Sequence, residues 1–125
     1  MDKRPSMKID DLEAVEKEKF VYLTTIGRNT GKPHRVELWF AIGTNGVYLS
    51  HEGERTDWMR NAQKRGRVKV EIGGVKFDAD AKLAISGEAR EEGKRALYEK
   101  YYGSANKEVI DDWFSLSEVV QLKPV

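Results

Sequence analysis

The sequence predicts a mainly β fold, a small barrel with helices at its periphery, formed by a single domain spanning residues 1–125. Two observations predict the barrel. The first is a series of short apolar runs joined by glycine turns, which is typical of antiparallel hairpins. The second is a long alternating stretch at residues 75–85, since a strand of that length usually bends around a barrel. A chain of 125 residues can bury a core without disulfides.

The first part of the chain is expected to form a helix and then three antiparallel strands. Residues 9–19 have apolar side chains at helical spacing, with acids early and lysines late, as the helix dipole favours. Pro33 is tolerated at the start of a strand, and Asn45-Gly46 predicts a hairpin turn. We expect the strands at residues 20–26, 36–42 and 47–50.

The second part mixes helices and strands. Thr56 is a suitable N-cap and Gly66 a suitable stop for a short basic helix. Gly73-Gly74 predicts a tight hairpin between two alternating strands, and Gly103 can end a longer helix. We expect helices at residues 55–64, 88–102 and 106–114, and strands at residues 68–72, 75–85 and 119–122.

The composition argues against several classes of function. A formal net charge of +1 gives no overall field to attract nucleic acid or an anionic membrane, so any anion site must be local. The absence of cysteine removes disulfides, thiolate catalysis and cysteine-ligated metal centres. The charged N-terminus lacks the apolar run of a signal peptide, and no segment has the roughly 20 apolar residues of a membrane span. We therefore expect a cytoplasmic protein with a small-molecule substrate, no nucleic-acid partner and no membrane span.

Two segments hold most of the polar chemistry, the turn at residues 27–33 and the hinge at residues 50–55. The turn sets glycines around Arg28, where backbone amides can approach an anion and the guanidinium can donate two hydrogen bonds. The N-terminus of the helix after the hinge is itself suited to anions. Together they could cradle a phosphorylated cofactor. The plainer alternative is a solvated loop and a surface helix, with Trp58 as a core residue.

The histidines do not form a recognisable catalytic set. His34 and His51 could act as acid and base, but histidines so far apart in sequence more often have unrelated roles. Neither has the spacing of metal ligands, so we predict no metal site. Ser50 and His51 are strand neighbours whose side chains point to opposite faces. GRNTGK is not a phosphate-binding P-loop, because Pro33 and a strand follow Lys32 where a helix is needed.

Aromatic side chains gather late in the chain, at Tyr98, Tyr101, Tyr102 and Trp113. They could wall a pocket for a flat substrate, or they could dock the helices on the barrel, which is the interpretation we favour for most of them. We expect Trp39, Tyr101 and Tyr102 to line the substrate pocket.

Several segments resemble the deazaflavin (F420)-dependent nitroreductase and quinone reductase family. Residues 23–33, LTTIGRNTGKP, resemble the opening LTTxGRxxGxP of that family. Residues 37–40, 50–53 and 57–61 are similar to its later segments, and residues 68–74 look like its RVxVxIGG element. These segments follow the family's order through the central part of the chain. The wider superfamily is the split β-barrel of FMN-binding, pyridoxamine phosphate oxidase-like proteins, so the resemblance implies that fold.

The resemblance implies an oxidoreductase that transfers a hydride between bound coenzyme F420, or alternatively FMN, and a flat electron-poor substrate such as a quinone or a nitro compound. The cofactor would carry the reaction and the protein would orient it, which explains why no catalytic set is visible. The ring is expected beside Ser50, His51 and Gly53, and the phosphate among Arg28, Arg35, Arg60 and Lys64. The expected cofactor-binding residues are Gly27, Arg28, Asn29, Gly31, His34, Arg35, Ser50, His51, Gly53, Trp58, Arg60, Asn61 and Lys64.

The main alternative is a non-catalytic module that uses the same barrel to hold a flavin, another phosphorylated ligand or a tetrapyrrole. Asn29, His34 and His51 stand where many relatives carry basic or glycine-rich residues, and fewer fixed charges leave room for FMN.

We also expect a homodimer, because related barrels pair and an exposed strand at residues 75–85 would gain from burying one face.

Overall fold

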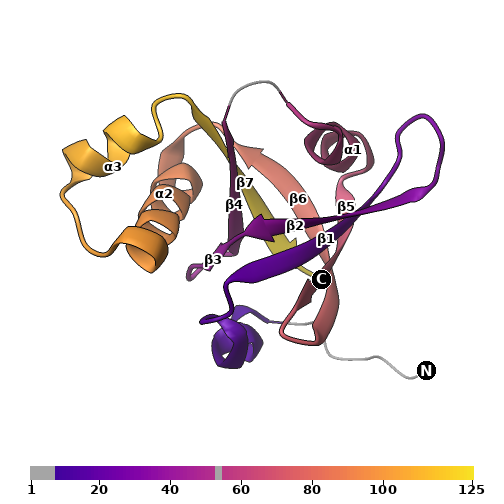
Figure 1. Ribbon diagram of the computed structural model, residues 1–125, viewed down its shortest axis with the longest axis horizontal. Coiled ribbons are helices and arrows are strands. Elements are labelled where there is room, and N and C mark those ends of the chain that lie inside the picture. The colour runs from indigo at the N-terminus through magenta and orange to yellow at the C-terminus, as the bar shows by residue number, and fades with distance from the viewer. Residues whose placement is uncertain (1–7, 53–54) are drawn as a thin grey trace.

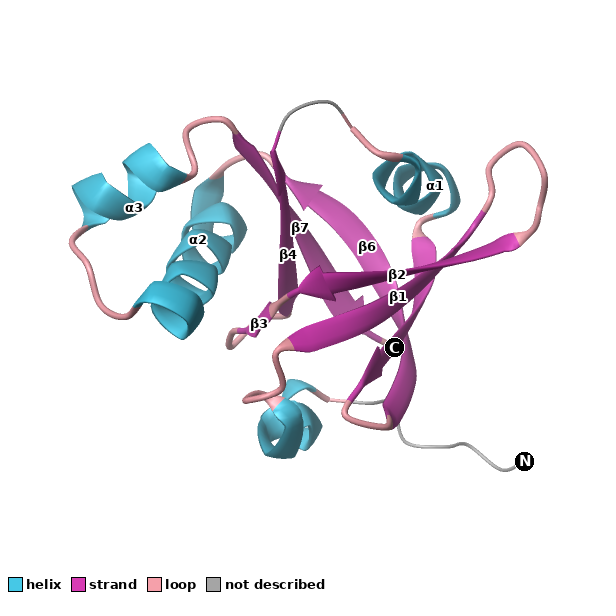
Figure 2. Ribbon diagram, viewed as in Figure 1, coloured by secondary structure: helices cyan, strands magenta, loops and turns pink. Residues whose placement is uncertain are grey.

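The computed structural model describes residues 8–52 and 55–125, which form one seven-stranded antiparallel sheet in the order β2-β1-β5-β6-β7-β4-β3. The sheet curls so that β1 and β2 cross in front of β6 and β7, and the end of β2 comes close to β4 (Figures 1 and 2). The elements are η1 (Ile9–Val15), β1 (Phe20–Ile26), β2 (Pro33–Trp39), β3 (Ala41–Ile42), β4 (Val47–Glu52), α1 (Asp57–Arg65), β5 (Arg67–Ile72), β6 (Val75–Ala84), α2 (Gly87–Tyr102), α3 (Lys107–Trp113) and β7 (Ser117–Pro124).

The helices cover the outside and the ends of the sheet. In Figure 1, α1 lies over one end of the curled sheet and η1 near the opposite end, while α2 and α3 lie together on one side. Helix α2 packs against β3, β4 and β7. None of the described helices is long and apolar enough to cross a membrane. This arrangement leaves the turn between β1 and β2 next to α1.

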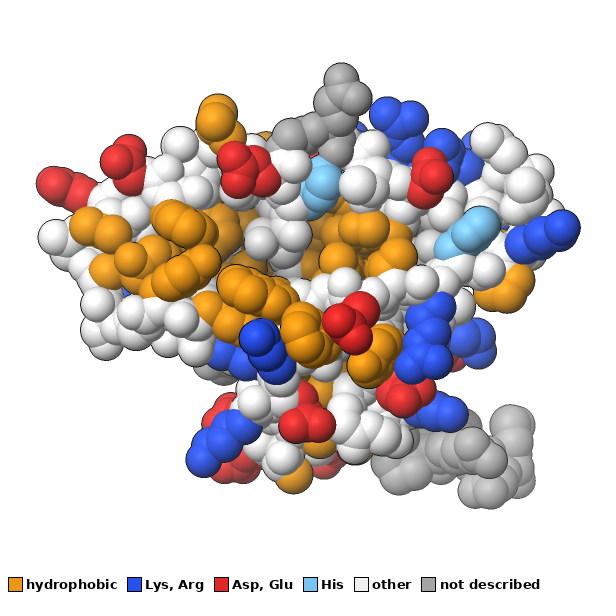
Figure 3. All heavy atoms as spheres, in the orientation of Figure 1, with side chains coloured by type: hydrophobic (Ala, Val, Ile, Leu, Met, Phe, Trp, Pro, Cys, Tyr) orange, Lys and Arg blue, Asp and Glu red, His pale blue; other side chains and the backbone are white. Residues whose placement is uncertain are grey.

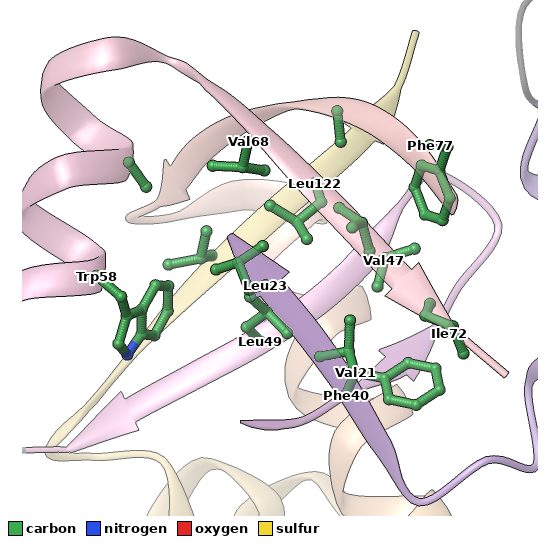
Figure 4. Close-up of a cluster of buried hydrophobic side chains, with 14 of the residues drawn as sticks. Val21, Leu23, Phe40, Val47, Leu49, Trp58, Val68, Ile72, Phe77 and Leu122 are labelled. Atoms are coloured by element: carbon green, nitrogen blue, oxygen red, sulfur yellow. The ribbon is translucent and has the colours of Figure 1, made fainter. Parts of the chain in front are cut away.

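The alternating strands direct one set of apolar side chains into the barrel. Val21 and Leu23 of β1 and Val68 of β5 are buried, and they point toward the side chains of Leu49 and Leu122 (Figure 4). Each such side chain contributes about 1.5–3 kcal/mol when it leaves water. The alternation that predicted the strands therefore also identifies the core.

One strand that the sequence predicted as continuous is divided into two in the structure. Residues 36–42 were expected to form one strand, but the structure divides them at Phe40 into β2, which pairs with β1, and β3, which pairs with β4. The hydroxyl of Tyr101 on α2 accepts a hydrogen bond from Phe40 N (3.0 Å) and shares its proton between the carbonyls of Phe40 and Lys19 (2.8 Å each). The Tyr101 hydroxyl thus provides hydrogen-bond partners for the N–H and the carbonyl of Phe40, which is not paired in the β-sheet.

Two other predictions differ from the structure, and a third holds only in part. The segment at residues 9–19 forms only a short 3-10 helix, η1. Ile85 is 76% exposed and lies beyond the end of β6. Strand β6 is central, between β5 and β7, and its Phe77 and Ala79 are buried. The strand therefore has no free edge, but its alternate residues Lys76, Asp78, Asp80 and Lys82 form an exposed outer face, and the homodimer stays a prediction.

A second apolar cluster docks α2 on the outside of the sheet. Gly93 has no space for a side chain, because a Cβ there would lie 2.7 Å from atoms of both Tyr48 and Val119. Glu92 accepts hydrogen bonds from the Tyr48 hydroxyl and from Asn45 N, 2.8 Å each. Burial and the Glu92 hydrogen bond raise the pKa of Tyr48 to about 12. Gly93 is thus the contact point between α2 and β4.

An ion cluster joins α2 to α3. The ammonium of Lys94, whose side chain is only 8% exposed, lies 2.6 Å from Asp111 and 3.1 Å from Glu91. Lys107 lies 2.6 Å from the other oxygen of Asp111, and hydrogen bonds from Lys107 and Lys94 lower the pKa of Asp111 to about 2. A nearly buried lysine is therefore paired on two sides, as a desolvated charge requires.

We predict that Tyr101→Phe lowers the free energy of unfolding by about 1–3 kcal/mol, because it leaves the Phe40 N–H and two carbonyls without their partner. Urea unfolding measures the loss. The matched control is Tyr102→Phe, since Tyr102 is 50% exposed and its change should stay within about 0.5 kcal/mol. Equal effects of the two substitutions would contradict the role assigned to Tyr101.

Candidate functional site

The turn between β1 and β2 is closed by its own backbone. Gly27 N donates to the carbonyl of Lys32 (2.7 Å), and Gly31 N donates to the carbonyl of Gly27 (2.9 Å). Gly31 has a φ of 72°, which glycine adopts without strain. A Cβ on Gly27 would lie 2.5 Å from the Thr30 hydroxyl and 3.1 Å from His34 Nε2. From the sequence, these glycines were expected to let backbone amides approach an anion. The structure shows that both are needed to shape the turn.

Asn61 connects this turn to α1. Its side chain is buried, and its Oδ1 accepts hydrogen bonds from Arg28 N (3.0 Å) and from the Arg28 guanidinium (2.9 Å). Its Nδ2 donates to the hydroxyl of Thr25, a buried residue on β1, at 3.4 Å. Arg65 adds a hydrogen bond from α1 to the carbonyl of Gly27 (3.2 Å). Asn61, one of the expected cofactor-binding residues, holds α1 against β1 and the turn.

The hinge is joined to β7 by a two-point ion pair. The guanidinium of Arg55 donates to both oxygens of Glu118, at 3.0 and 2.8 Å, and to Gln63 of α1 at 3.2 Å. These bonds lower the pKa of Glu118, and the positive field of His51 adds to that effect. His51 is the cross-strand partner of Glu118. Gly53, which was predicted to contact the ring, lies outside the described residues.

A basic cleft of about 780 Å³ opens where the turn, the hinge and α1 meet. Two of its cations have carboxylate partners: Arg28 lies 3.3 Å from Asp57, and Arg55 binds Glu118. Within residues 8–52 and 55–125, Arg60 and Lys64 form no ion pair. The residues that line the cleft are Arg28, Arg55, Arg60, Gln63 and Lys64.

Arg35 lies elsewhere. Its guanidinium is 4.5 Å from the centre of the Tyr22 ring and 3.8 Å from Glu71, on the outer face of β1 and β5. It lines a different cavity of about 430 Å³, with Lys69 and Lys76. Side chains of a strand alternate, so Arg35 points away from the face that carries its neighbour His34. The structure therefore does not bring Arg35 to the predicted phosphate site.

Ser50 and His51 also lie on opposite faces. Ser50 pairs with Val119, which packs in the cluster under α2 and α3. His51 lies on the face of Leu49, which belongs to the barrel core. On β2, Val36 and Leu38 follow His34 on one face and are partly buried against that core. Figure 3 shows an apolar patch between the two histidines, with lysine and arginine side chains gathered at one edge.

The remaining predicted residues are placed as follows. Trp58 is only 6% exposed and belongs to the barrel core, while Asn29 is exposed at the tip of the turn. Tyr101 stacks on Trp39, with ring centres 4.3 Å apart, on the outside of the barrel. Tyr102 packs against Trp113 instead, at 4.8 Å. Trp39, Tyr101 and Tyr102 thus serve the docking of α2 and α3 rather than forming one pocket beside the cleft.

Two residues that fix the cleft, Glu118 and Thr25, were not among the expected site residues, although Thr25 lies within the motif at residues 23–33. Glu118 is on the last strand, 63 residues from Arg55, and Thr25 is 36 residues from Asn61. A lone carboxylate and a lone hydroxyl give no signal in a sequence. Arg55 was noted in the hinge, but only the pairing of β4 with β7 brings Glu118 to it. The described residues contain no cluster of three or more side chains that could hold a metal ion.

Comparison with protein families matches residues 9–110 to the F420H(2)-dependent quinone reductase family. None of the curated proteins matches the chain significantly. The comparison with solved structures gives the fold. A conserved hypothetical protein from Mycobacterium tuberculosis shares 19% identity at a TM-score of 0.76, over 99% of this chain and 86% of that chain.

Two further solved structures are similar over most of both chains. A putative pyridoxamine 5'-phosphate oxidase from Listeria innocua shares 15% identity at a TM-score of 0.64, over 93% of this chain and 92% of that chain. An F420-H2 dependent reductase shares 21% identity at a TM-score of 0.57, over 82% of this chain and 94% of that chain. These likenesses confirm the predicted split β-barrel.

We predict that Asn61→Ala lowers the free energy of unfolding by about 1–3 kcal/mol, because Arg28 N–H and its guanidinium lose a buried acceptor. Amides of residues 27–31 should exchange faster with deuterium, since the turn loses its attachment to α1. Chemical denaturation and hydrogen exchange measure these effects. Asn29→Ala, an exposed change in the same turn, is the control. Unchanged exchange in Asn61→Ala would refute the role of Asn61.

Proposed function

Because the chain belongs to the F420H(2)-dependent quinone reductase family, we propose that it is an oxidoreductase that transfers a hydride between coenzyme F420 and a flat electron-poor substrate, such as a quinone or a nitro compound. The match of residues 9–110 to the family carries this proposal. It also confirms the predicted cofactor, coenzyme F420, by the family's own description. The basic cleft supplies independent chemical support.

The residues of the cleft fit an anionic cofactor. Coenzyme F420 carries a phosphate and carboxylates on its side chain, and these need cations that are not already neutralised. Arg60 and Lys64 meet that need, since they are exposed, lie one helical turn apart on α1 and form no ion pair with the described residues. Arg28 pairs with Asp57, and Arg55 pairs with Glu118. These two arginines therefore fix the shape of the cleft as well as contributing positive charge to it.

The apolar patch between the histidines suits a planar ring. Val36 and Leu38 of β2 offer partly buried apolar surface, and a ring laid there would exclude water from the reacting face. His51 stands at the edge of this surface, opposite Glu118 in the pairing of β4 with β7. When bound, the reduced deazaflavin ring supplies the hydride, and the protein's part is to hold ring and substrate in contact.

A homodimer and a cytoplasmic location stay predictions. A monomeric mass in dilute solution would contradict the first, and export of the protein from its cell would contradict the second.

The function is tested by titrating the purified protein with oxidised coenzyme F420 and, in parallel, with FMN. We expect F420 to bind more tightly, and we expect the protein to oxidise reduced F420 only when a quinone or nitro compound is present. Calorimetry follows binding, and the absorbance of the cofactor follows turnover. Binding without turnover would support the non-catalytic module. Tighter binding of FMN than of F420 would assign FMN as the cofactor instead. Binding of neither would overturn the proposal.

We predict that the double variant Arg60→Gln/Lys64→Gln binds F420 about tenfold or more weakly, since two charge-assisted contacts are lost. The loss should shrink in high salt, because exposed charges are screened. The control is Arg95→Gln/Lys123→Gln, which removes the same charge from other exposed positions. Calorimetry at two salt concentrations measures both variants. Equal affinities of the two variants would show that α1 does not bind the anionic groups.

A further inference from the structure

A separate cavity of about 630 Å³ lies between the η1–β1 segment, β3 and α2. It shares no residue with the basic cleft. Its lining combines apolar side chains of β3 and α2 with charged side chains from the segment before β1 and from α2. The lining residues are Glu16, Lys17, Lys19, Ala41, Ile42, Ala96, Glu99, Lys100 and Tyr101.

Lys100 is a half-buried cation in this lining. Its ammonium lies 3.4 Å from the centre of the Phe40 ring and donates a hydrogen bond to the carbonyl of Glu18 at 2.6 Å. Among the described residues it forms no ion pair, in contrast to Lys94 on the same helix, which has two carboxylates. An ammonium has three donors, and this carbonyl is the one hydrogen-bond acceptor that Lys100 has in the described chain. The cation therefore has capacity for an anion.

The charge balance of the cavity selects the kind of anion. Three lysines and two glutamates line it, which leaves a surplus of one positive charge in the lining, and the carboxylate of Glu18, just outside the lining, also acts on Lys100. A singly charged group matches that surplus, whereas a phosphate dianion would meet repulsion from Glu16 and Glu99. Ala41, Ile42 and Ala96 offer apolar surface to the rest of a ligand. A carboxylate with an apolar body fits both features.

We propose that this cavity binds a small organic carboxylate, whose charged group pairs with the ammonium of Lys100 and whose apolar part lies against Ala41, Ile42 and Ala96. The site is separate from the proposed F420 cleft, so the two assignments stand or fall independently. Burial lowers the pKa of Lys100 to about 8, against the opposing fields of Glu16 and Glu18. A bound carboxylate would favour the ammonium, so binding should weaken as the pH rises through 8.

The test uses the whole chain and benzoate as the probe. Trp39 stacks on Tyr101, whose ring lines the cavity, so tryptophan fluorescence and calorimetry should both report binding. We expect saturable binding of benzoate at pH 7, weaker binding at pH 9.5, and none of the neutral isostere benzamide. Lys100→Met should weaken benzoate binding about tenfold, because a charge-assisted hydrogen bond is lost. Lys17→Met, which removes an exposed lysine from the same lining, should change the affinity about threefold or less.

Several results would overturn the proposal. They are the absence of saturable benzoate binding to the wild-type protein, equal binding of benzamide, or full affinity in Lys100→Met. Circular dichroism establishes that each variant is folded. Should Lys100→Met fail to fold, the comparison of benzoate with benzamide and the pH dependence in the wild-type protein decide the question. Benzoate should not compete with F420, and competition would place it in the basic cleft instead.

Discussion

The buried amide of Asn61 is the contact on which the candidate site depends. It accepts two hydrogen bonds from Arg28 and donates one to Thr25, so one side chain joins the end of β1, the following turn and α1. Because a buried amide must find partners, these three segments have one favourable arrangement. That arrangement sets Arg60 and Lys64 on the open side of α1, beside the turn, and so creates the basic cleft.

Two groups of cations in this protein have different physical roles. Arg28, Arg55 and Lys94 have carboxylate partners and fix the geometry of loops and helices. Arg60 and Lys64 have none among the described residues, and they carry the free positive charge of the cleft. A chain with a formal net charge of +1 can thus present a local anion site, because the distribution of its charges, and not their sum, decides where unpaired cations gather.

Helix α2 explains why the late aromatic residues are structural. Gly93 lets the helix approach Tyr48, Glu92 binds the β3–β4 turn, and Tyr101 satisfies the backbone of Phe40. These contacts place α2 on the outside of the barrel, away from the apolar patch between the histidines. The same docking creates the cavity in which Lys100 is left without a carboxylate, so the second proposed site follows from the packing of one helix.

The sequence by itself determined the strands, the core and the family. Alternation with period two identifies the buried faces of β1, β5 and β6 from the residue pattern alone, since successive side chains of a strand point to opposite faces. Turn glycines and the ordered motifs likewise predicted the positions of the first turn and of α1 from the sequence. Tertiary structure alone decided which polar residues meet. Arg35 lies on the outer face, Phe40 divides a strand, and Glu118 reaches Arg55, because each depends on a partner far along the chain. Local patterns encode backbone periodicity, whereas a site requires the register of paired strands and the docking of helices, which no local pattern contains.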